Sequence, residues 1–245
     1  LNAEINFDAI PATVINGSNV YSNYGECEKA VFEAVEMINK AKKPVVVVGG
    51  GVNSAGASEE VRAFVEKFKL PVVSTLMGLG AFPRRHQQSL GLTGLHGLKT
   101  ANNAVYEADV VIAIGSRFSD RLTGNRDKYS SDKYVIHIDI DPAEIDKNVM
   151  AGVGLPGEIK SIINMINKFE NTNDISNWWS DINSWRAEYQ IEYNNQYLNV
   201  PWLMNHISEC TKDEDVLFVT DVGQHQMWAA QNLKIDNPRT WLTSG

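Results

Sequence analysis

A run of β-branched residues, Val45–Val48, leads directly into three consecutive glycines, Gly49–Gly51, and constrains the fold more than any other segment. A strand that is apolar at every position has no face for water, and such strands occur inside parallel sheets that are covered on both sides. Glycine adopts backbone angles that other residues avoid, so the strand is expected to end in a tight turn. The segment therefore predicts a buried strand of an α/β sheet.

Strand and helix patterns alternate along the chain after this segment. Residues 70–75, 109–115 and 134–141 are rich in strand-forming residues. Apolar residues at helical spacing predict helices over 26–42, 102–107 and 157–169. A further helix is predicted to begin after Ser58, as its N-cap, and to run to Phe68. This alternation predicts right-handed βαβ units and a doubly wound parallel sheet of the α/β class.

The composition divides the chain into four expected segments. Residues 1–28 are rich in Asn, Gly, Pro and Ser and are expected to form a linker before an α/β domain over 29–170. Residues 171–200 are polar and aromatic, and they are expected to become a helix on the domain surface with its aromatic side chains as packing anchors. A second strand–helix pattern occupies 201–245, and the chain is expected to be a piece of a larger protein whose second domain is truncated.

The charge and the cysteines disfavour several classes of protein. A net charge of −8 and the lack of any Lys/Arg run argue against a nucleic-acid or membrane surface. The longest apolar run is too short to span a bilayer, and the first residues do not resemble a signal peptide. Cys27 and Cys210 are far apart in the sequence, so they are expected to be reduced thiols of a cytoplasmic protein, and no metal site is predicted.

Candidate ligand-binding residues follow the predicted strands, where parallel α/β sheets bind their ligands. Gly49–Gly51 could bring the main chain close to a phosphate, or could form a tight turn only. Because Val52, Asn53 and Ser54 follow directly, the spacing departs from the G-x-G-x-x-G fingerprint and disfavours a standard NAD site.

Charged residues follow two other strands. Arg117 and Arg121, with Asp120 between them, could hold a phosphate or sugar, or could make interdomain salt bridges. Asp139 and Asp141 end a strand and could accept ribose hydroxyls, or could cap the helix that begins after them.

Glycine-bearing loops complete the candidate set. Thr75, Gly78 and Gly94 are compatible with close main-chain contact to a flat ligand, and His96 lies between glycines, which favours exposure or ligand contact over a core position. No motif of a zinc site, a nucleophilic serine or a P-loop occurs. Together these features predict a nucleotide that extends across the sheet.

Six motifs, in this order, resemble the catalytic large subunits of the acetolactate synthase (acetohydroxyacid synthase) family: VVVVGGGV, STLMGLGAFP, GLTGLHG, GSRFSDR, HIDIDPAEI and TDVGQHQMWAAQ. The resemblance begins near residue 40 and covers nearly all of the chain after it. It implies a Rossmann-like central domain that holds FAD, followed by the start of the domain that binds thiamine diphosphate.

The resemblance also implies which residues contact the cofactors. FAD contacts are implied at Gly50, Thr75, Leu76, Met77, Gly78, Thr93, Gly94, Leu95, His96, Gly115, Ser116, Arg117, Phe118, Ser119, Asp139, Ile140, Glu158 and Ile159. Gln224 and His225 are implied at the diphosphate end of thiamine diphosphate, as neutral donors suited to a diphosphate that a metal already neutralises. Ser119 replaces a second acid that the family often carries in this motif, which weakens one polar contact.

The implied activity is the thiamine-diphosphate-dependent decarboxylation of pyruvate and its condensation with a second 2-keto acid, in branched-chain amino-acid synthesis. The implied magnesium ligands and the activating glutamate have no counterpart here, so no catalytic residue is assigned and the chain alone is expected to be inactive. A homo-oligomer with a regulatory small subunit is also implied.

Three alternatives to this activity remain. A pyruvate oxidase or another thiamine-diphosphate carboligase would share the fold, whereas a nucleotide-binding or assembly module would have no chemistry of its own. NAD-dependent deacylases are disfavoured, because their usual four-cysteine zinc site cannot be built from two cysteines.

Overall fold

The computed structural model describes residues 24–190 and 199–244. Its main sheet has six parallel strands in the order β3-β2-β1-β4-β5-β6. The strands are β1 (Pro44–Val48), β2 (Val72–Ser74), β3 (Ser89–Leu92), β4 (Val110–Ile114), β5 (Tyr134–Asp139) and β6 (Val153–Pro156). The doubly wound parallel sheet predicted from the sequence is confirmed.

The glycine-terminated strand lies at the centre of this sheet. β1 pairs with β2 on one side and β4 on the other, so that Val46 lies between Val72 and Ile112. Val45–Val48 are 0% exposed, as expected for a strand with a helical layer on each face.

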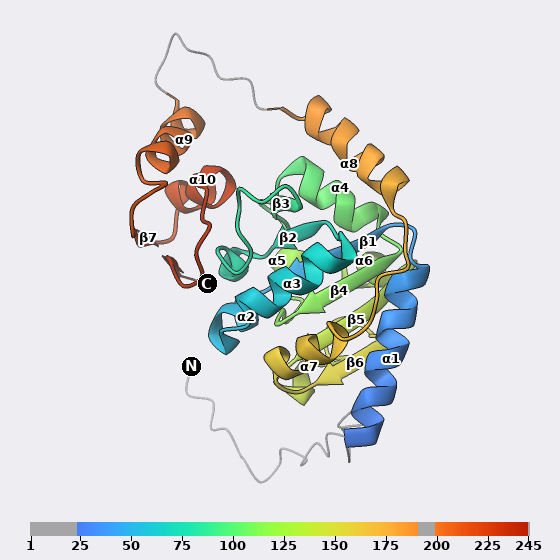
Figure 1. The fold of residues 1–245 in the computed structure, drawn as a ribbon. Coiled ribbons are helices and arrows are strands. Elements are labelled where there is room, and N and C mark those ends of the chain that lie inside the picture. The colour runs from blue at the N-terminus through green and yellow to red at the C-terminus, as the bar shows by residue number, and fades with distance from the viewer. Residues whose placement is uncertain (1–23, 191–198, 245) are drawn as a thin grey trace, which may run out of the picture.

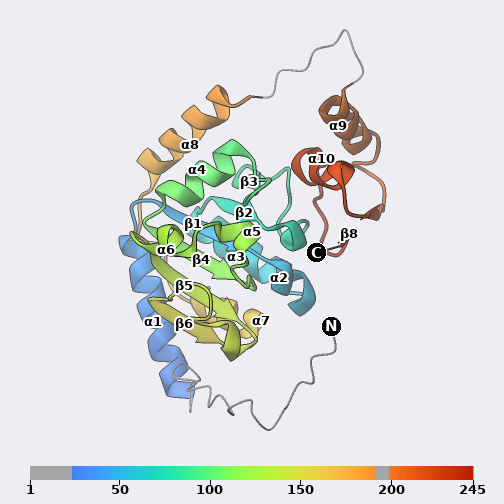
Figure 2. The ribbon, with the colours of Figure 1, turned by 180° about the vertical axis from the view of Figure 1, so that it is seen from behind.

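Helices cover both faces of the sheet (Figures 1 and 2). They are α1 (Tyr24–Lys40), α2 (Gly50–Ala55), α3 (Ser58–Phe68), α4 (Lys99–Glu107), α5 (Asp120–Thr123), α6 (Arg126–Ser130) and α7 (Ile159–Ile166), with 3-10 turns η2 (Leu76–Gly78) and η3 (Pro142–Glu144). α3 and α7 lie in front of the sheet in Figure 1, and α5 and α6 lie in front in Figure 2. Within the described residues, no helix combines the length and apolar character that crossing a bilayer requires.

The helix α8 (Ser176–Glu188) packs along the amino-terminal edge of the sheet through its tryptophans. Trp178 is buried and donates its indole N–H to the carbonyl oxygen of Pro44 at 3.0 Å, and Trp179 donates to that of Lys69 at 2.8 Å. Trp185 meets Trp178 edge to face. The expected packing role of these aromatic residues is confirmed.

The C-terminal segment forms a small second layer against the carboxyl-terminal edge of the sheet (Figure 1). It consists of α9 (Val200–Cys210), β7 (Phe218–Thr220), α10 (Gln224–Asn232) and β8 (Trp241–Thr243), with β7 and β8 parallel. Leu79 and Leu92 of the main domain share an apolar cluster with Ala230, Leu233 and Ile235 of this segment. Hydrophobic burial therefore joins the two parts.

Several details differ from the sequence-based expectations. The strands β3 and β6 were not predicted, because each is only four residues long and contains a glycine that interrupts the apolar pattern. Ser58 is the first residue of α3 rather than its cap; Ala57 occupies the cap position, without a side-chain hydrogen bond. Residues 24–28 of the predicted linker belong to α1, and residues 1–23 lie outside the described residues.

A polar joint reinforces the contact between the main domain and the C-terminal segment. Arg85 forms ion pairs with Asp236 and Glu209, and it donates to the carbonyl oxygen of Ser208 at 2.8 Å. The main-chain N–H of Arg85 also donates to Asp236 at 2.7 Å. Burial disfavours the charged form of Arg85, but the bonds to Asp236 and Glu209 together outweigh it and raise the pKa of Arg85.

We expect Asp236→Asn to lower the free energy of unfolding by about 1–2 kcal/mol, since it removes the charge of a half-buried, multiply bonded carboxylate. Urea unfolding followed by tryptophan fluorescence measures the change. The control is Glu36→Gln, whose exposed partner Lys40 lies 3.6 Å away, and which is expected to cost less than about 0.5 kcal/mol. Equal losses of unfolding free energy in the two variants would show that the Asp236 carboxylate stabilises the protein no more than a surface ion pair does.

Candidate functional site

Every strand of the main sheet ends in residues that the sequence predicts to contact a nucleotide. In the sheet order β3, β2, β1, β4, β5 and β6, they are Thr93–His96, Thr75–Gly78, Gly50, Gly115–Ser119, Asp139 with Ile140, and Glu158 with Ile159. Because the strands are parallel, the structure brings all of these segments to one edge of the sheet. The chain leaves β1 toward β2 and β4 toward β5, which opens the crevice where such sheets bind ligands.

The loops after β1 and β4 pack main chain against main chain in this crevice. A Cβ atom at Gly49 would lie 2.0 Å from the carbonyl oxygen of Gly115, and one at Gly115 would lie 2.7 Å from the Cα of Gly51. Gly115 also has a φ of +60°, in the region that favours glycine. Similarly, a Cβ atom at Gly78 would lie 2.2 Å from the carbonyl oxygen of Val48. No side chain fits at these contacts.

The hydrogen bonds of the glycine run limit what it can offer a phosphate. Gly49 donates its N–H to Ile114 at 2.9 Å, and Gly51 donates to Gly115 at 3.0 Å. The N–H of Gly50 is donated to no acceptor among the described residues. The tight-turn interpretation therefore accounts for two of the three glycines, and Gly50 is the one whose N–H is available to a ligand.

Asn102, on α4, holds the loop after β3. Its side-chain oxygen accepts from the hydroxyl of Thr93 at 3.0 Å and from the N–H of Gly94 at 2.9 Å, and its amide nitrogen donates to the carbonyl oxygen of Gly94. The N–H of Leu95 donates to the carbonyl oxygen of Arg121 at 2.8 Å, which ties this loop to the loop after β4. Asn102 was not singled out from the sequence, because a lone asparagine in a helix gives no signal.

His137, on β5, supports the loop after β4. Its Nε2 lies 2.9 Å from the carbonyl oxygen of Ser116, and since a carbonyl only accepts, we assign the proton to Nε2. Burial lowers the pKa of His137, so the neutral ring is favoured. Its other nitrogen is buried without a partner among the described residues. The ring meets that of Phe118 edge to face, and Phe118 has a φ of +49°, so core packing holds this strained residue in place.

The two arginines of this loop are exposed, and neither forms an ion pair with a described residue. The salt-bridge alternative for Arg117 and Arg121 is therefore not seen within the part of the chain that the structure describes. The carbonyl oxygen of Arg117 accepts from Asn148 at 2.9 Å. Ser119 caps α5 without a side-chain hydrogen bond, so its hydroxyl is not committed to the helix. Both cations are available to an anionic ligand.

Apolar side chains are unusually exposed at this edge. Met77, Leu95 and Ile140 are 45%, 74% and 64% exposed. In contrast, Phe118 and Ile159 are buried in the core, so contacts with a ligand would have to use their main chains. Leu76 packs against the cluster that joins the C-terminal segment.

A cavity of about 460 Å³ adjoins the loops after β3 and β4, and its lining includes Thr93–Leu95, Tyr106 and Arg121. The exposed apolar side chains and the adjoining cavity together suit a flat ligand that is partly apolar.

The acidic candidates divide into two groups. Asp139 is 6% exposed, and its side chain accepts from the N–H of Asp141 at 3.0 Å. Asp141 accepts from the N–H of Ala143 at 2.9 Å and caps η3, so the capping interpretation is confirmed for this residue. Glu158 occupies the N-cap position of α7, but its side chain makes no hydrogen bond to the main chain of the helix. It accepts from the hydroxyl of Ser161.

The three polar side chains in the first turn of α10, at the strand–helix corner, have different surroundings. Gln224 and His225 are exposed. Gln226 is buried and donates to the hydroxyl of Thr243 and to the carbonyl oxygen of Ser244, each at 2.7 Å, which ties α10 to β8. Further along the same helix, Gln231 donates to the carbonyl oxygen of His96 at 2.8 Å. α10 therefore connects the two predicted cofactor sites.

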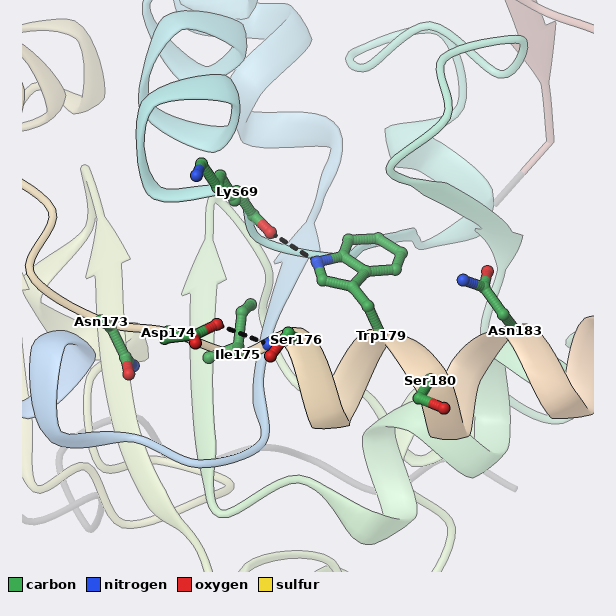
Figure 3. Close-up of a pocket in the computed structure, with 8 residues that line it drawn as sticks. All are labelled: Lys69, Asn173, Asp174, Ile175, Ser176, Trp179, Ser180 and Asn183. Carbon is green, nitrogen blue, oxygen red and sulfur yellow. Dashed lines mark hydrogen bonds between the residues drawn. The ribbon is translucent and has the colours of Figure 1, made fainter.

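A larger cavity, of about 650 Å³, lies near the opposite edge of the sheet between α8 and Lys69 (Figure 3). Two hydrogen bonds join its lining residues: the Trp179 indole donates to the carbonyl oxygen of Lys69, and Asp174 accepts from the N–H of Ser176 at 3.0 Å. These bonds anchor the start of α8, so this cavity is a structural joint. The predicted ligand-binding residues lie at the carboxyl-terminal edge instead.

Comparison with known proteins agrees with this arrangement. The family model described as "Thiamine pyrophosphate enzyme, central domain" matches residues 31–166. The chain belongs to the thiamine pyrophosphate enzyme family. The match covers the main sheet, with all six strands and the loops at their carboxyl ends. Among the described residues of this family member, no group of three or more His, Cys, Asp or Glu could hold a metal ion.

Individual relatives of this thiamine pyrophosphate enzyme carry a more specific name. An acetolactate synthase of Mycobacterium bovis is 41% identical over 226 residues, which cover 89% of this chain and 36% of that protein. The acetolactate synthase large subunit of Corynebacterium glutamicum is 40% identical and covers the whole chain. The isozyme 3 large subunit of Escherichia coli is 39% identical over 86% of the chain. The chain spans 36% to 40% of the length of these relatives.

We expect Gly115→Ala to lower the free energy of unfolding by about 3 kcal/mol or more, from a disfavoured backbone angle and a clash with the glycine run. Gly124→Ala is the matched control, because Gly124 has a φ of +61° but nothing within 4 Å of its would-be Cβ. The control is expected to cost about 1–2 kcal/mol from backbone strain alone. Urea unfolding of both variants measures the difference, and similar losses would contradict the packing argument.

We expect Asn102→Ala to destabilise the protein by about 2–3 kcal/mol, because it removes three hydrogen bonds of the loop after β3. Asn103→Ala, at the adjacent position, removes one bond of 3.3 Å to Tyr189 and is expected to cost less than about 1 kcal/mol. Hydrogen exchange gives the local readout, since the Gly94 amide should lose protection in the first variant only. Unchanged protection would show that Asn102 does not hold the loop.

Proposed function

We propose that this chain is the FAD-binding central part of an acetolactate synthase large subunit, together with the first elements of its thiamine-diphosphate-binding domain. The observation that carries the proposal is the gathering of all the FAD residues implied by the resemblance at the carboxyl edge of one sheet. Relatives of that name are about 40% identical over nearly the whole chain, which favours this activity over a pyruvate oxidase.

The chemistry of the edge fits a flavin dinucleotide. A flavin has a flat, largely apolar ring, and Met77 and Leu95 offer exposed apolar surface for such a group, whereas Ile140, beside Asp139, would address the adenosine side. Its diphosphate needs positive charge and free N–H donors, which Arg117, Arg121 and the Gly50 N–H can supply. FAD in this proposal is structural, and its binding would hold the loops after β2, β3 and β4 in one arrangement.

The buried carboxylate suits the ribose part of the same nucleotide. Asp139 ends β5, where an acid can accept ribose hydroxyl groups. One of its oxygens holds the N–H of Asp141 at 3.0 Å, so the carboxylate is oriented before a ligand binds. Gly50 and the arginine loop, on the central strands, would then take the diphosphate.

The corner at Gln224 and His225 is proposed to border the diphosphate of thiamine diphosphate. Both side chains are exposed, whereas Gln226 anchors the corner from behind. Thiamine diphosphate, with magnesium, supplies the carbanion chemistry that decarboxylates a 2-keto acid. The residues of this chain position that cofactor, and none of them is proposed to act as a catalytic acid or base.

The activity and the partners of the longer protein are part of the same proposal. The substrates are pyruvate and a second 2-keto acid, and the isolated chain is expected to form no acetolactate from pyruvate. A homo-oligomer with a regulatory small subunit, a cytoplasmic location and the absence of nucleic-acid or membrane partners stay predictions. The domain limits 29–170, 171–200 and 201–245 are proposed as well.

Titration of the purified chain with FAD, followed by quenching of flavin fluorescence, tests the proposal, with NAD and FMN as controls. We expect saturable binding that is selective for FAD. Arg117→Gln is expected to raise the Kd for FAD about tenfold, because one charge-assisted contact is lost.

The control for this titration is Arg62→Gln, in α3, whose ion pair with Glu66 lies on the surface. It should leave the Kd for FAD unchanged. A folded chain that binds FAD no better than NAD would overturn the proposal, as would equal effects of the two substitutions.

A further inference from the structure

Four cationic side chains gather where the segment after η2, the helix α8 and the residues after α10 meet. They are Arg84, Arg85, Arg186 and Lys234. The main chain joins these segments, since Arg84 donates its N–H to Ile235 at 3.2 Å. None of the four belongs to the predicted FAD or thiamine diphosphate residues. The cluster is notable in a chain whose net charge is −8.

The acids of the cluster are committed to one of these cations. Asp236 and Glu209 both form ion pairs with Arg85. Arg186 donates to the carbonyl oxygens of Gln87 at 2.7 Å and Ser89 at 3.2 Å. Two of the four cations therefore have their partners inside the protein.

Arg84 has no such partner. Its guanidinium lies flat against Gly91, where an added Cβ would come within 2.8 Å of three guanidinium atoms. Its Nε is shielded from solvent and has no hydrogen-bond partner, and the guanidinium forms no ion pair with a described residue. Burial, with the nearby charge of Arg186, lowers the pKa of Arg84, although the charge of Asp236 acts in the opposite direction. Arg84 is half-buried, and a guanidinium nitrogen that is shielded from water without an acceptor is costly, which favours an anionic ligand here.

Lys234 is the second cation that lacks a counter-charge. Its main-chain N–H donates to the hydroxyl of Ser208 at 2.9 Å, but its ammonium group forms no ion pair with a described residue. Burial, then the charges of Arg84 and Arg85, lower the pKa of Lys234 to about 8, although Asp236 and Glu209 act in the opposite direction. Arg84 and Lys234 thus repel each other across a partly desolvated joint.

We propose that Arg84 and Lys234 form a binding site for a phosphate-class oxyanion at the joint between the main domain and the C-terminal segment. A planar guanidinium and a point-charged ammonium group together suit a small dianion better than a flat organic ligand. The anion would neutralise both charges and join segments from either side of the contact. Its binding therefore stabilises the position of α10, which follows from charge and does not depend on the proposed flavin site.

The site is distinct from the predicted nucleotide edge. Gly91, under the Arg84 guanidinium, lies in the middle of β3, which is the edge strand of the sheet. The predicted flavin residues lie beyond the carboxyl ends of the strands. Inorganic phosphate and FAD should accordingly bind without competition.

The test is a titration of this chain with inorganic phosphate at constant ionic strength, with chloride as the balancing anion. Thermal unfolding and isothermal titration calorimetry are the readouts. We expect saturable binding and a Tm that rises by about 3–6 °C at a phosphate concentration about ten times its Kd. The affinity should fall as the pH rises through about 8, where Lys234 loses its proton.

Two substitutions identify the residues that bind. Arg84→Gln should abolish the phosphate effect, and Lys234→Met should weaken it and remove its dependence on pH above 8. Arg62→Gln, remote from the joint, is the control and should change neither. If Arg84→Gln does not fold, the pH profile of Lys234→Met decides alone.

Three results would overturn the proposal. They are the absence of saturable phosphate binding to the folded chain, a phosphate effect that Lys234→Met leaves intact, and displacement of phosphate by FAD. The last result would assign the phosphate to the flavin edge. Failure of FAD binding with phosphate binding intact would instead count against the proposed function alone.

Discussion

The contact between the glycine run after β1 and Gly115 after β4 is the constraint on which the rest of the structure depends. At this point the chain leaves β1 toward β2 and leaves β4 toward β5, on opposite sides. The main chains of the two loops come too close for any Cβ atom. Hydrogen bonds from Gly49 to Ile114 and from Gly51 to Gly115 lock the two loops together. The crevice that a parallel sheet offers to ligands is thereby built from backbone, and side chains are left to the loops around it.

Those surrounding loops are held from outside the crevice, by side chains whose role only the tertiary structure reveals. Asn102 reaches from α4, His137 from β5, Asn148 from the segment after η3, and Asn53 from α2, where it donates to the carbonyl oxygen of Leu79 at 3.2 Å. Asn102 bonds to the loop after β3 and Asn53 to the residues after η2, whereas His137 and Asn148 both bond to the loop after β4. The exposed arginines and apolar side chains of the edge are therefore presented on loops that are already positioned, which reduces the entropy lost when a ligand binds.

The sequence predicts the parts of this fold in which a local pattern coincides with its physical cause. The uniform burial of Val45–Val48 and the tryptophan anchors of α8 are of this kind. β3 and β6 escape prediction because pairing with a neighbouring strand, rather than residue preference, makes such short glycine-containing segments extended. Asn102 and His137 escape for a similar reason, since their bonding partners lie in loops after other strands. Gly49 and Gly51 show the converse, because a pattern that suggested phosphate contact serves internal packing at two of its three positions.

The C-terminal segment is fixed to the sheet by three kinds of interaction that act at different places. Apolar burial around Leu233 and Ile235 stabilises the contact but does not fix its geometry, because the hydrophobic effect is non-directional. Hydrogen bonds supply direction, as where Gln231 meets the carbonyl oxygen of His96. The charges at the joint are not balanced in this way. Both acids, Asp236 and Glu209, form ion pairs with Arg85, and Arg84 and Lys234 form no ion pair with a described residue. Apolar burial and hydrogen bonds hold the joint together, whereas its charge is not balanced, which is why we propose that it binds an anion. Since α10 carries the Gln224–His225 corner, an anion bound at this joint would also stabilise the position of that corner relative to the predicted nucleotide edge.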